Sequence, residues 1–444
     1  MKQGSQIRWV VLAVIWITFI INYLDRVSVL TFLPLIRQDL NLTHSQIGQA
    51  ASAFFLAYAL TQVFLGWAAD RFRPKVLMNL AIGLFSIVTF FTGLMRSFAQ
   101  FMVIRVLLGI GEGLHTPPIF RTIANWFPKS EKGRATAIFA TTWGIGPAFI
   151  PLLVTWLATM FESWRPVFMI LFLPGLIGIL LVTYLIDDTP DAAKQRKRIT
   201  EEEYRYIKNG LVEVGVEQRL NFREQVRVVL GDISFWAYCV SLFCLLGVFW
   251  GSTAWLSSFL YEQHKFKIIT MGALASLPYV AAATAMVAGG WCLDRIFKGR
   301  VKPLLILSFI SSIPVLYFIA RIPTGHVGLL VLCLILLGFC VNLSFGVVYG
   351  YPQIRYPKET LGFASGFSNG SGQFGSFVAP LVAGYLVVKT ATGVDYSNVF
   401  TFFALLALGG AVCALLMSEK PYHYEAKLST YRQVSPVEDA KSSL

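Results

Sequence analysis

Apolar segments of about 20 residues recur along the whole chain, and this repetition restricts what the chain can fold into. Each segment is long enough to cross a hydrocarbon layer roughly 30 Å thick as a single helix. We count twelve such segments, the first at residues 9–35 and the last at 399–417. Only 14% of the residues are charged, far fewer than in a soluble domain. The sequence therefore predicts an all-α membrane protein with twelve transmembrane helices.

The basic residues are distributed over alternate loops. The chain carries 37 Lys and Arg against 24 Asp and Glu, which gives a formal net charge of +13. A nucleic-acid partner would require one basic patch, whereas most of these residues fall in every second loop. Placing both termini in the cytoplasm satisfies the positive-inside rule, and the reverse orientation violates it. We therefore expect a multi-pass protein of the inner (cytoplasmic) membrane, monomeric in the lipid bilayer and without a nucleic-acid partner.

Short motifs occur twice, once in each half of the chain. The stretch Gly66-Trp-Ala-Ala-Asp-Arg returns as Gly290-Trp-Cys-Leu-Asp-Arg, and Phe127-Pro-Lys returns as Tyr356-Pro-Lys. A parallel repeat of this kind is a recognised transporter plan, with the substrate held between the halves. The chain therefore divides into two pseudo-symmetric six-helix halves, 1–186 and 231–417, with a cytoplasmic linker, 187–230, between them and a polar cytoplasmic tail, 418–444.

Two apolar segments of the first half contain charged residues. Asp25 and Arg26 lie in the first segment, and Arg105 and Glu112 lie in the fourth. Arg105 and Glu112 are seven residues apart, close to two helical turns, so their side chains point to the same side. A charge at the bilayer centre costs roughly 3 kcal/mol on insertion scales. Each of these residues therefore needs a partner, a water-filled cavity or a bound proton.

The second half does not repeat these charges. The repeat places Leu334 at the position of Arg105 and Val341 at the position of Glu112. A purely structural ion pair would be needed in both halves of a symmetric scaffold. We therefore interpret Arg105 and Glu112 as functional residues, in substrate binding or in coupling, rather than as a structural pair.

Nothing in the sequence indicates an enzyme, a metal site or a cofactor. The six cysteines all fall inside apolar segments without metal-type spacing, so we expect neither disulfides nor zinc. The glycines at 109, 111 and 113 resemble a dinucleotide loop, but no strand precedes them, and we reject that interpretation. His115 lies about one turn beyond Glu112 and could relay protons. Without a visible partner for it, we interpret His115 as a packing residue.

The stretch Gly66-x-x-x-Asp70-Arg71-Phe-x-x-Lys75 resembles the loop signature of the major facilitator superfamily, with Arg73 where that family usually has glycine. Its repeat in the second half extends the resemblance over nearly the whole chain. The resemblance implies a transporter that works by rocking its two halves. At the cytoplasmic helix ends we expect conformational latches rather than substrate sites, formed by Asp70, Arg71, Asp294 and Arg295.

Within that superfamily, three motifs resemble the anion:cation symporter family, which includes bacterial transporters of galactonate, glucarate and hexuronates. The motifs are Asn22-Tyr-Leu-Asp-Arg26, Arg105-x6-Glu112 and Trp126-Phe-Pro-x-x-Glu-Lys-Gly-Arg134. The resemblance implies that Asp25 and Glu112 exchange protons. It also places six residues around the substrate or its gate: Tyr23, Arg26, Tyr58, Arg105, Tyr349 and Asn369.

One position departs from the sugar-acid members, which have a glutamine in the fifth helix where this chain has Ile145. Losing that amide makes a smaller or more apolar carboxylate credible. We expect a proton-coupled symporter that imports a small organic anion, either a sugar acid or another carboxylate. Two alternatives stay open. Gly144-Ile-Gly-Pro partly resembles a motif of drug exporters, which would mean an organic-anion or drug antiporter, and a transporter-like sensor is disfavoured by the lack of a long soluble extension.

Overall fold

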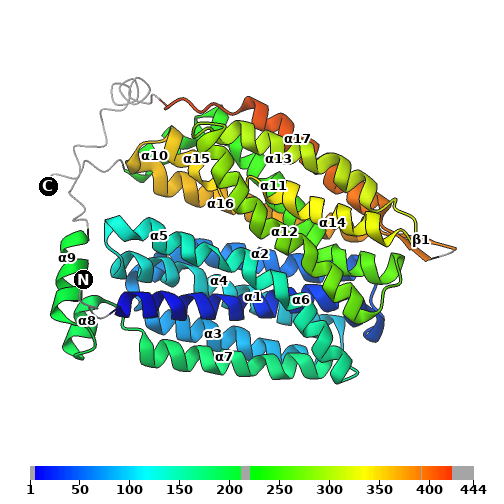
Figure 1. Cartoon of the computed structure of the whole chain (residues 1–444), viewed down its shortest axis with the longest axis horizontal. Helices are drawn as coiled ribbons and strands as arrows, with labels where there is room; N and C mark the ends of the chain where they lie inside the picture. Colours follow the sequence, from blue (N-terminus) through cyan, green and yellow to red (C-terminus); the bar gives the residue numbers. More distant parts are fainter. Residues whose placement is uncertain (1–5, 212–220, 392, 423–444) are drawn as a thin grey trace.

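The computed structural model describes residues 6–211, 221–391 and 393–422, and at 63–71, 222 and 358 it describes the backbone only. Within these residues the chain is almost entirely helical (Figure 1). The first half contains α1 (Ile7–Asp39), α2 (His44–Arg71), α3 (Pro74–Thr92), α4 (Phe98–Trp126), α5 (Lys129–Ala140), α6 (Thr142–Met160) and α7 (Arg165–Leu185).

Three short helices occupy the linker: α8 (Pro190–Gln195), α9 (Glu201–Gly210) and α10 (Phe222–Leu230). The second half contains α11 (Ile233–Ser258), the π-helix η1 (Phe259–Gln263), α12 (Ile268–Arg295), α13 (Val301–Ile319), α14 (Val327–Asn342), the 3-10 helix η2 (Val348–Gly350), α15 (Tyr351–Arg355), α16 (Lys358–Leu386) and α17 (Ser397–Leu416). A small antiparallel hairpin, β1 (Val388–Thr390) and β2 (Gly393–Asp395), precedes α17 and departs from the all-α expectation.

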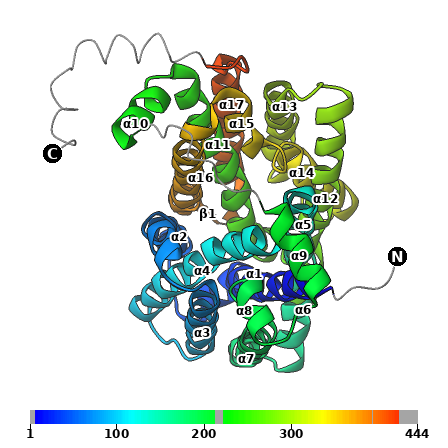
Figure 2. The same cartoon turned by 90° about the vertical axis from the view of Figure 1, so that its left-hand side faces the viewer.

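The helices run between two ends of the molecule, which we name from α1. The near end is where α1 begins at Ile7 and α17 ends at Leu416, and the far end is where α1 ends at Asp39. Figure 2 views the molecule from the near end and shows the helices of each half grouped together, with α11 and α1 toward the middle. The figure therefore shows two helix groups, whereas the domain bounds expected from the repeat, 1–186 and 231–417, remain a prediction.

Nine helices of the described chain are long and apolar enough to cross a membrane, as expected for a multi-pass membrane protein. The helices α2, α14 and α16 occupy the other three predicted segments, and α14 is a shorter apolar helix of 16 residues. The membrane character of the chain is therefore clear. The total of twelve transmembrane helices remains a prediction.

Local sequence signals explain several helix boundaries. The Ser97 side chain accepts a hydrogen bond from the Gln100 amide and so caps the first turn of α4. Pro74 occupies the first turn of α3, where its missing N–H costs nothing. In the linker, the Glu203 carboxylate of α9 accepts hydrogen bonds from the backbone N–H groups of Ile7 and Arg8. The linker is thereby fixed to the start of α1, because those amides have no partner within the helix.

The tenth predicted segment is not one continuous helix. This tenth apolar segment of the sequence covers residues 327–351, but α14 ends at Asn342, turns follow at 343–347, and the helix resumes as η2 and α15. The side-chain amide of Asn342 donates a hydrogen bond to the Gly338 carbonyl at 2.9 Å. Local side-chain bonding of this kind competes with the helix ladder. The chain is therefore irregular at the depth where the two halves face each other.

The halves are joined most closely at the far end. The Gln49 amide of α2 donates to the Tyr385 hydroxyl of α16 at 2.9 Å. A Cβ at Gly48 would lie 2.8 Å from the Pro380 carbonyl oxygen, so glycine is needed where α2 crosses α16. Toward the near end, the ribbons of the two halves diverge (Figure 1). The far end is therefore the closed side of this structure.

Candidate functional site

A buried ion pair between α1 and α4 forms the centre of the candidate site. The Nε atom of Arg26 donates to Oε2 of Glu112 at 2.8 Å, and Nη2 lies 2.6 Å from the same oxygen. Arg26 is 5% exposed and Glu112 is fully buried. The other carboxylate oxygen, Oε1, has no hydrogen-bond partner among the described residues. The pair therefore leaves one acceptor site of Glu112 unused in an environment where unpaired polar atoms are costly.

Aromatic rings surround the Arg26 guanidinium. Its Cζ atom lies 4.8 Å from the ring centroid of Tyr58, 4.9 Å from that of Phe54, 5.2 Å from that of Trp250 and 5.4 Å from that of Tyr23. Each ring face attracts the cation without neutralising it. Trp250 belongs to the second half, so both halves contribute to this environment. Neither Phe54 nor Trp250 was predicted from the sequence, because an aromatic residue on an apolar helix is most simply read as packing.

Arg105 does not pair with Glu112. Its Nε donates to the Ala50 carbonyl at 3.0 Å and its Nη2 to the Ala51 carbonyl at 3.4 Å, both on α2. Its Cζ lies 4.6 Å from the Phe54 ring, which also faces Arg26. The Nη1 atom is buried and unpartnered within the described chain. Although the sequence places Arg105 and Glu112 on one side of α4, the structure gives Glu112 to Arg26 and attaches Arg105 to α2.

Asp25 is fully buried beside this pair. The Thr89 hydroxyl of α3 lies close to its carboxylate, but neither group completes a hydrogen bond with any described residue. An ionised carboxylate without donors is strongly disfavoured in such a place. The position therefore favours the neutral, protonated form of the Asp25 carboxyl group.

A chain of hydrogen bonds connects the predicted residues Tyr58 and Asn369. The Asn369 amide of α16 donates to the Gln62 side-chain oxygen at 3.3 Å, and the Gln62 amide donates to the Tyr58 hydroxyl at 2.9 Å. The Tyr58 hydroxyl also lies 3.3 Å from the Thr116 hydroxyl of α4. This series of hydrogen bonds connects the second half to the first half at mid-depth. A substrate bound near Tyr58 would therefore affect hydrogen bonds that both halves share.

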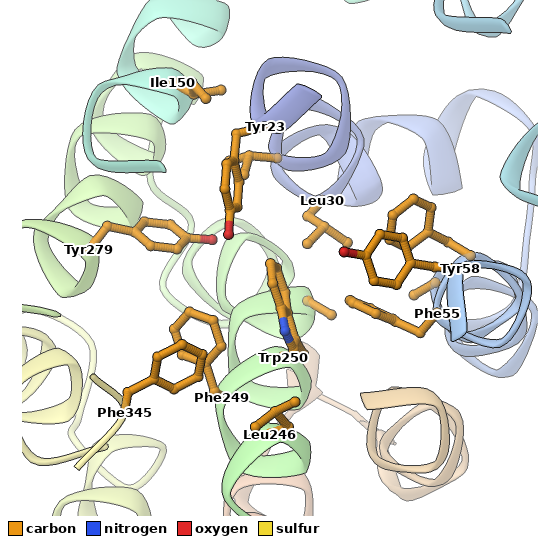
Figure 3. Close-up of a cluster of buried hydrophobic side chains, with 14 of the residues drawn as sticks. Tyr23, Leu30, Phe55, Tyr58, Ile150, Leu246, Phe249, Trp250, Tyr279 and Phe345 are labelled. Atoms are coloured by element: carbon orange, nitrogen blue, oxygen red, sulfur yellow. The ribbon is translucent and has the colours of Figure 1, made fainter. Parts of the chain in front are cut away.

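Figure 3 shows a cluster of aromatic side chains where the two halves meet. The hydroxyl groups of Tyr23 on α1 and Tyr279 on α12 point toward each other, and Trp250 lies between α1 and α11. Phe345, in the break after α14, packs with its ring centroid 5.2 Å from that of Phe249 and 6.2 Å from that of Tyr349. The broken helix thus carries the predicted residue Tyr349 and the unpredicted Phe345 toward the site.

A second buried charge cluster closes the far end. The Glu262 carboxylate, in the π-helix η1, accepts from Nε of Arg37 at 2.7 Å and from the Tyr396 hydroxyl at 2.8 Å. Its other contact is with Nε2 of His44, at 2.7 Å. Arg37 and His44 belong to the first half, whereas Glu262 and Tyr396 belong to the second. Sequence reasoning missed this cluster because Glu262 is more than 200 residues away from Arg37 and His44 along the chain, and because Glu262 directly follows the predicted apolar segment rather than lying inside it.

Two of the four predicted latch residues, Asp294 and Arg295, have described side chains. Asp294 and Arg295 are exposed at the near end of α12, and neither forms an ion pair with a described residue. Asp70 and Arg71 lie outside the residues whose side chains are described. The latch prediction stays a prediction, and an unengaged pair on the second half agrees with the divergence of the halves at the near end.

Ile145 does not face the site. It is 44% exposed and lies on a stripe of α6 with Phe149, Leu152 and Trp156, all of them exposed. The opposite side of α6 faces inward, where a Cβ at Gly146 would contact the side chains of Ile20 and Tyr23. Position 145 is therefore not part of the candidate site in this structure, and our argument about the substrate from the missing glutamine stays a prediction.

The described residues contain no group of three or more His, Cys, Asp and Glu side chains placed to hold a metal ion. At the far end, a cavity of about 1260 Å³ lies between the halves, and the charge cluster of Arg37 and Glu262 forms part of its lining together with Arg165, Lys265 and Glu162. The ion pair of Arg26 and Glu112 is not part of this lining.

Comparisons with known proteins cover most of the chain. The family model of the Major Facilitator Superfamily matches residues 15–380 and again 268–441. The probable sulfoacetate transporter SauU of Cupriavidus necator is 29% identical over 94% of this chain and 95% of its own length. The D-galactonate transporter of Escherichia coli is 25% identical over 94% of this chain and 96% of its own length.

Solved structures share the fold. A bacterial homolog of the human lysosomal transporter Spinster superposes with a TM-score of 0.71 at 16% identity, over 93% of this chain and 95% of that chain. A D-xylose-proton symporter superposes with a TM-score of 0.71 at 14% identity, over 93% and 98%. At these identities the likeness concerns the fold.

Proposed function

Because the chain belongs to the major facilitator superfamily and is therefore a membrane transporter rather than an enzyme, we propose that it couples the movement of a small organic anion to that of protons. The Arg26–Glu112 pair is the single observation that carries this proposal. Arg26 is a buried cation, and its only carboxylate partner within the described chain is Glu112, which can take up a proton. A substrate anion and Glu112 compete for the same guanidinium.

Protonation of Glu112 releases Arg26. Once Glu112 is neutral, the guanidinium keeps its charge and offers a planar fork to an incoming carboxylate or sulfonate. When the substrate has left and Glu112 is ionised, Arg26 and Glu112 form their ion pair again. Binding of the anion and binding of the proton therefore favour each other, which is the requirement for symport.

Asp25 supplies the second proton site. It is buried next to Thr89 and lies one residue before Arg26 on α1. Neutralising Asp25 and Glu112 together lets the loaded site change conformation without an unpaired charge in a low-dielectric interior. Both carboxyl groups then lose their protons on the other side.

We assign the substrate to the small carboxylates and sulfonates. Similar proteins are named as transporters of sulfoacetate, galactonate and glucarate, which are all organic anions. The rings of Tyr23, Tyr58 and Trp250 enclose the cation, and their hydroxyl and indole groups can bond an oxygen-rich anion. Asn369 and Tyr349 complete the polar lining from the second half, while Arg105 positions Phe54 and α2.

The near end is assigned to the cytoplasm, in the inner membrane, with both termini there. The positive-inside rule supports this orientation. With the halves joined at the far end by Glu262, the structure corresponds to the state that opens toward the cytoplasm. The latch pairs Asp70–Arg71 and Asp294–Arg295 would close the near end in the opposite state, and the protein acts as a monomer.

Uptake into liposomes tests the proposal. Purified protein is reconstituted, a pH gradient is imposed with the acidic side outside, and the uptake of labelled sulfoacetate, D-galactonate and glucarate is measured. Symport predicts accumulation of at least one of these anions above its external concentration, and loss of accumulation when a protonophore collapses the gradient.

The other outcomes decide between the alternatives. Accumulation when the gradient is reversed would replace symport by antiport. Binding of an anion without any flux would favour the sensor. Failure of all three anions to bind or move would overturn the assignment of the substrate class.

A further inference from the structure

Three helices of the first half each bring two buried polar side chains, spaced three residues apart, to the region around Asp25. Residues at this spacing share a helix face. All six are at most 1% exposed. They are Asn22 and Asp25 on α1, Ser86 and Thr89 on α3, and Glu112 and His115 on α4.

Every one of these six side chains has a polar atom without a partner in the described chain. For Asn22, Asp25 and His115, both terminal polar atoms of the side chain lack a hydrogen bond; for Ser86 and Thr89 it is the hydroxyl, and for Glu112 it is Oε1. Buried polar atoms in native proteins are bonded to protein groups or to ordered water. A concentration of six such side chains is not explained by packing, and it points to bound water.

The six side chains form two levels along the helix axes. Asp25, Thr89 and Glu112 belong to the inner level, since Thr89 lies close to Asp25 and Glu112 pairs with the neighbouring residue Arg26. Because α1 and α3 run from the near end and α4 runs toward it, Asn22, Ser86 and His115 lie three residues, about 4.5 Å, closer to the near end. The outer level therefore stands between the carboxyl groups and the near end.

Two aromatic rings fix the His115 ring at this outer level. Its centroid lies 6.0 Å from that of Phe19 on α1, with the planes at 19°, and 5.7 Å from that of Phe85 on α3, with the planes at 68°. Phe19 precedes Asn22 by one turn, and Phe85 is adjacent to Ser86. The rings hold the imidazole by its apolar surface and leave both nitrogens for other partners.

We propose that His115 is a proton-relay residue, which passes the protons released by Glu112 and Asp25 toward the near end of the first half. This inference rests on the proposed proton coupling, and it replaces our interpretation of His115 as a packing residue. Asn22 and Ser86 hold the waters that bridge the imidazole to the carboxyl groups. Neutral imidazole has one donor and one acceptor nitrogen, which is the requirement for a relay.

The path continues toward the near end along α3. Asn79 lies seven residues before Ser86, on the same face and about 10 Å closer to that end. Its amide donates to the Thr183 hydroxyl of α7 at 3.0 Å, while its oxygen is buried and unpartnered among the described residues. Gly175 on α7 lies directly against the Ser86 hydroxyl, where a Cβ would collide with it. Asn79 is therefore a second polar position on this face of α3, about 10 Å nearer the near end than Ser86, with apolar residues between them.

The transfer is balanced at each step. A carboxyl group gives its proton to a bridging water, and that water gives a proton to the acceptor nitrogen of His115. The other nitrogen releases its proton to the water chain that leads past Asn79. Rotation of the ring restores the original tautomer, so His115 and the bridging waters are neutral again and the negative charge stays on the carboxylate that released the proton.

His115→Phe separates a relay from a packing role. Phenylalanine keeps a ring between Phe19 and Phe85 and removes both nitrogens. The probe is whichever of labelled sulfoacetate and D-galactonate the wild-type protein accumulates in liposomes. We expect pH-driven uptake to slow by roughly ten- to a hundredfold, in line with the loss of a proton-transfer group, while exchange of internal for external anion stays within about twofold because exchange does not require proton release.

Two further variants complete the experiment. Asn22→Leu should show the same selective loss, and Thr92→Val serves as the control, since the Thr92 hydroxyl is already bonded to the Val88 carbonyl on the far-end side of α3. Unchanged pH-driven uptake in both His115→Phe and Asn22→Leu would overturn the relay. Equal loss of uptake and exchange in a well-folded His115→Phe variant would also overturn it, in favour of packing. A wild-type protein without pH-driven uptake would instead contradict the proposed function itself.

Discussion

The fourth helix of the first half and its repeat in the second half occupy the same depth but differ in two ways. In α4, Arg105 and Glu112 are fully buried charges, whereas the equivalent Leu334 and Val341 are buried apolar side chains. The helix α4 continues to Trp126 through two prolines, whereas its counterpart stops at Asn342 and turns. One half carries the ionisable groups on a rigid element, and the other carries the irregular backbone.

The difference separates two tasks. A proton site needs fixed geometry, because the balance between a buried carboxyl group and a guanidinium depends on their distance. A binding surface that must change shape around a substrate benefits from a segment with fewer helical backbone hydrogen bonds, because such a segment moves more easily. Under the proposed function, the asymmetry assigns coupling to the first half and adjustment of the binding surface to the second.

Glu112→Gln should give the largest effect. The amide oxygen still accepts a hydrogen bond from Arg26, but the group can no longer exchange a proton. We expect pH-driven accumulation of the anion to fall by roughly a hundredfold or more, to the level of passive equilibration, while anion exchange persists. Uptake and exchange in liposomes measure the two activities separately.

Glu203→Gln provides the matched control, since Glu203 is also buried and paired with an arginine, Arg8, but lies in the linker. It should leave coupling unchanged. Concentrative uptake by Glu112→Gln would show that the charges of α4 are structural, and the contrast between the halves would lose its functional meaning.

Val341→Glu introduces into the second half the carboxylate that Glu112 provides at the equivalent position of the first half. Val341 is buried and lines a small cavity with Phe249, Ser252 and Asn342, without a basic residue in that lining. A carboxylate without a cation there should destabilise the protein by about 3 kcal/mol. Thermal unfolding in detergent should show a clear decrease, while Val341→Leu, which keeps the site apolar, should change stability far less. Equal stability of Val341→Glu and wild type would contradict the view that only the first half can hold this charge.

Gly346→Ala tests the broken helix and should give the smallest effect. A Cβ there would lie 3.7 Å from Met286, so alanine fits. Alanine favours the helix by roughly 0.5–1 kcal/mol, which should oppose the break. We expect transport to slow a few-fold, with the affinity for protons unchanged.

Gly409→Ala is the control for Gly346→Ala, because Gly409 has room for a Cβ inside the continuous helix α17. It should gain similar stability without a change in rate. If both variants transport at the wild-type rate, the break is a fixed feature of the fold rather than a moving one.

The sequence predicted most of the architecture. Helix positions followed from apolar length, because a backbone in lipid must satisfy its own hydrogen bonds. The division into halves was predicted from the repeated motifs. The need of Asp25, Arg26 and Glu112 for a partner, a cavity or a proton was predicted from the cost of a charge in hydrocarbon. These are properties of one segment at a time, so the chain alone determines them.

The partners of those charges were decided by the tertiary structure. Periodicity gives the face of a residue on its own helix but not the helix that packs against that face. The pairing of Glu112 with Arg26 rather than Arg105, the outward position of Ile145, and the joining of Glu262 to Arg37 and His44 all depend on how separate helices are arranged. The chain by itself determined which residues need partners, and only the packing of the helices decided which partners they have, because contacts between distant segments are fixed by the relative positions of whole elements.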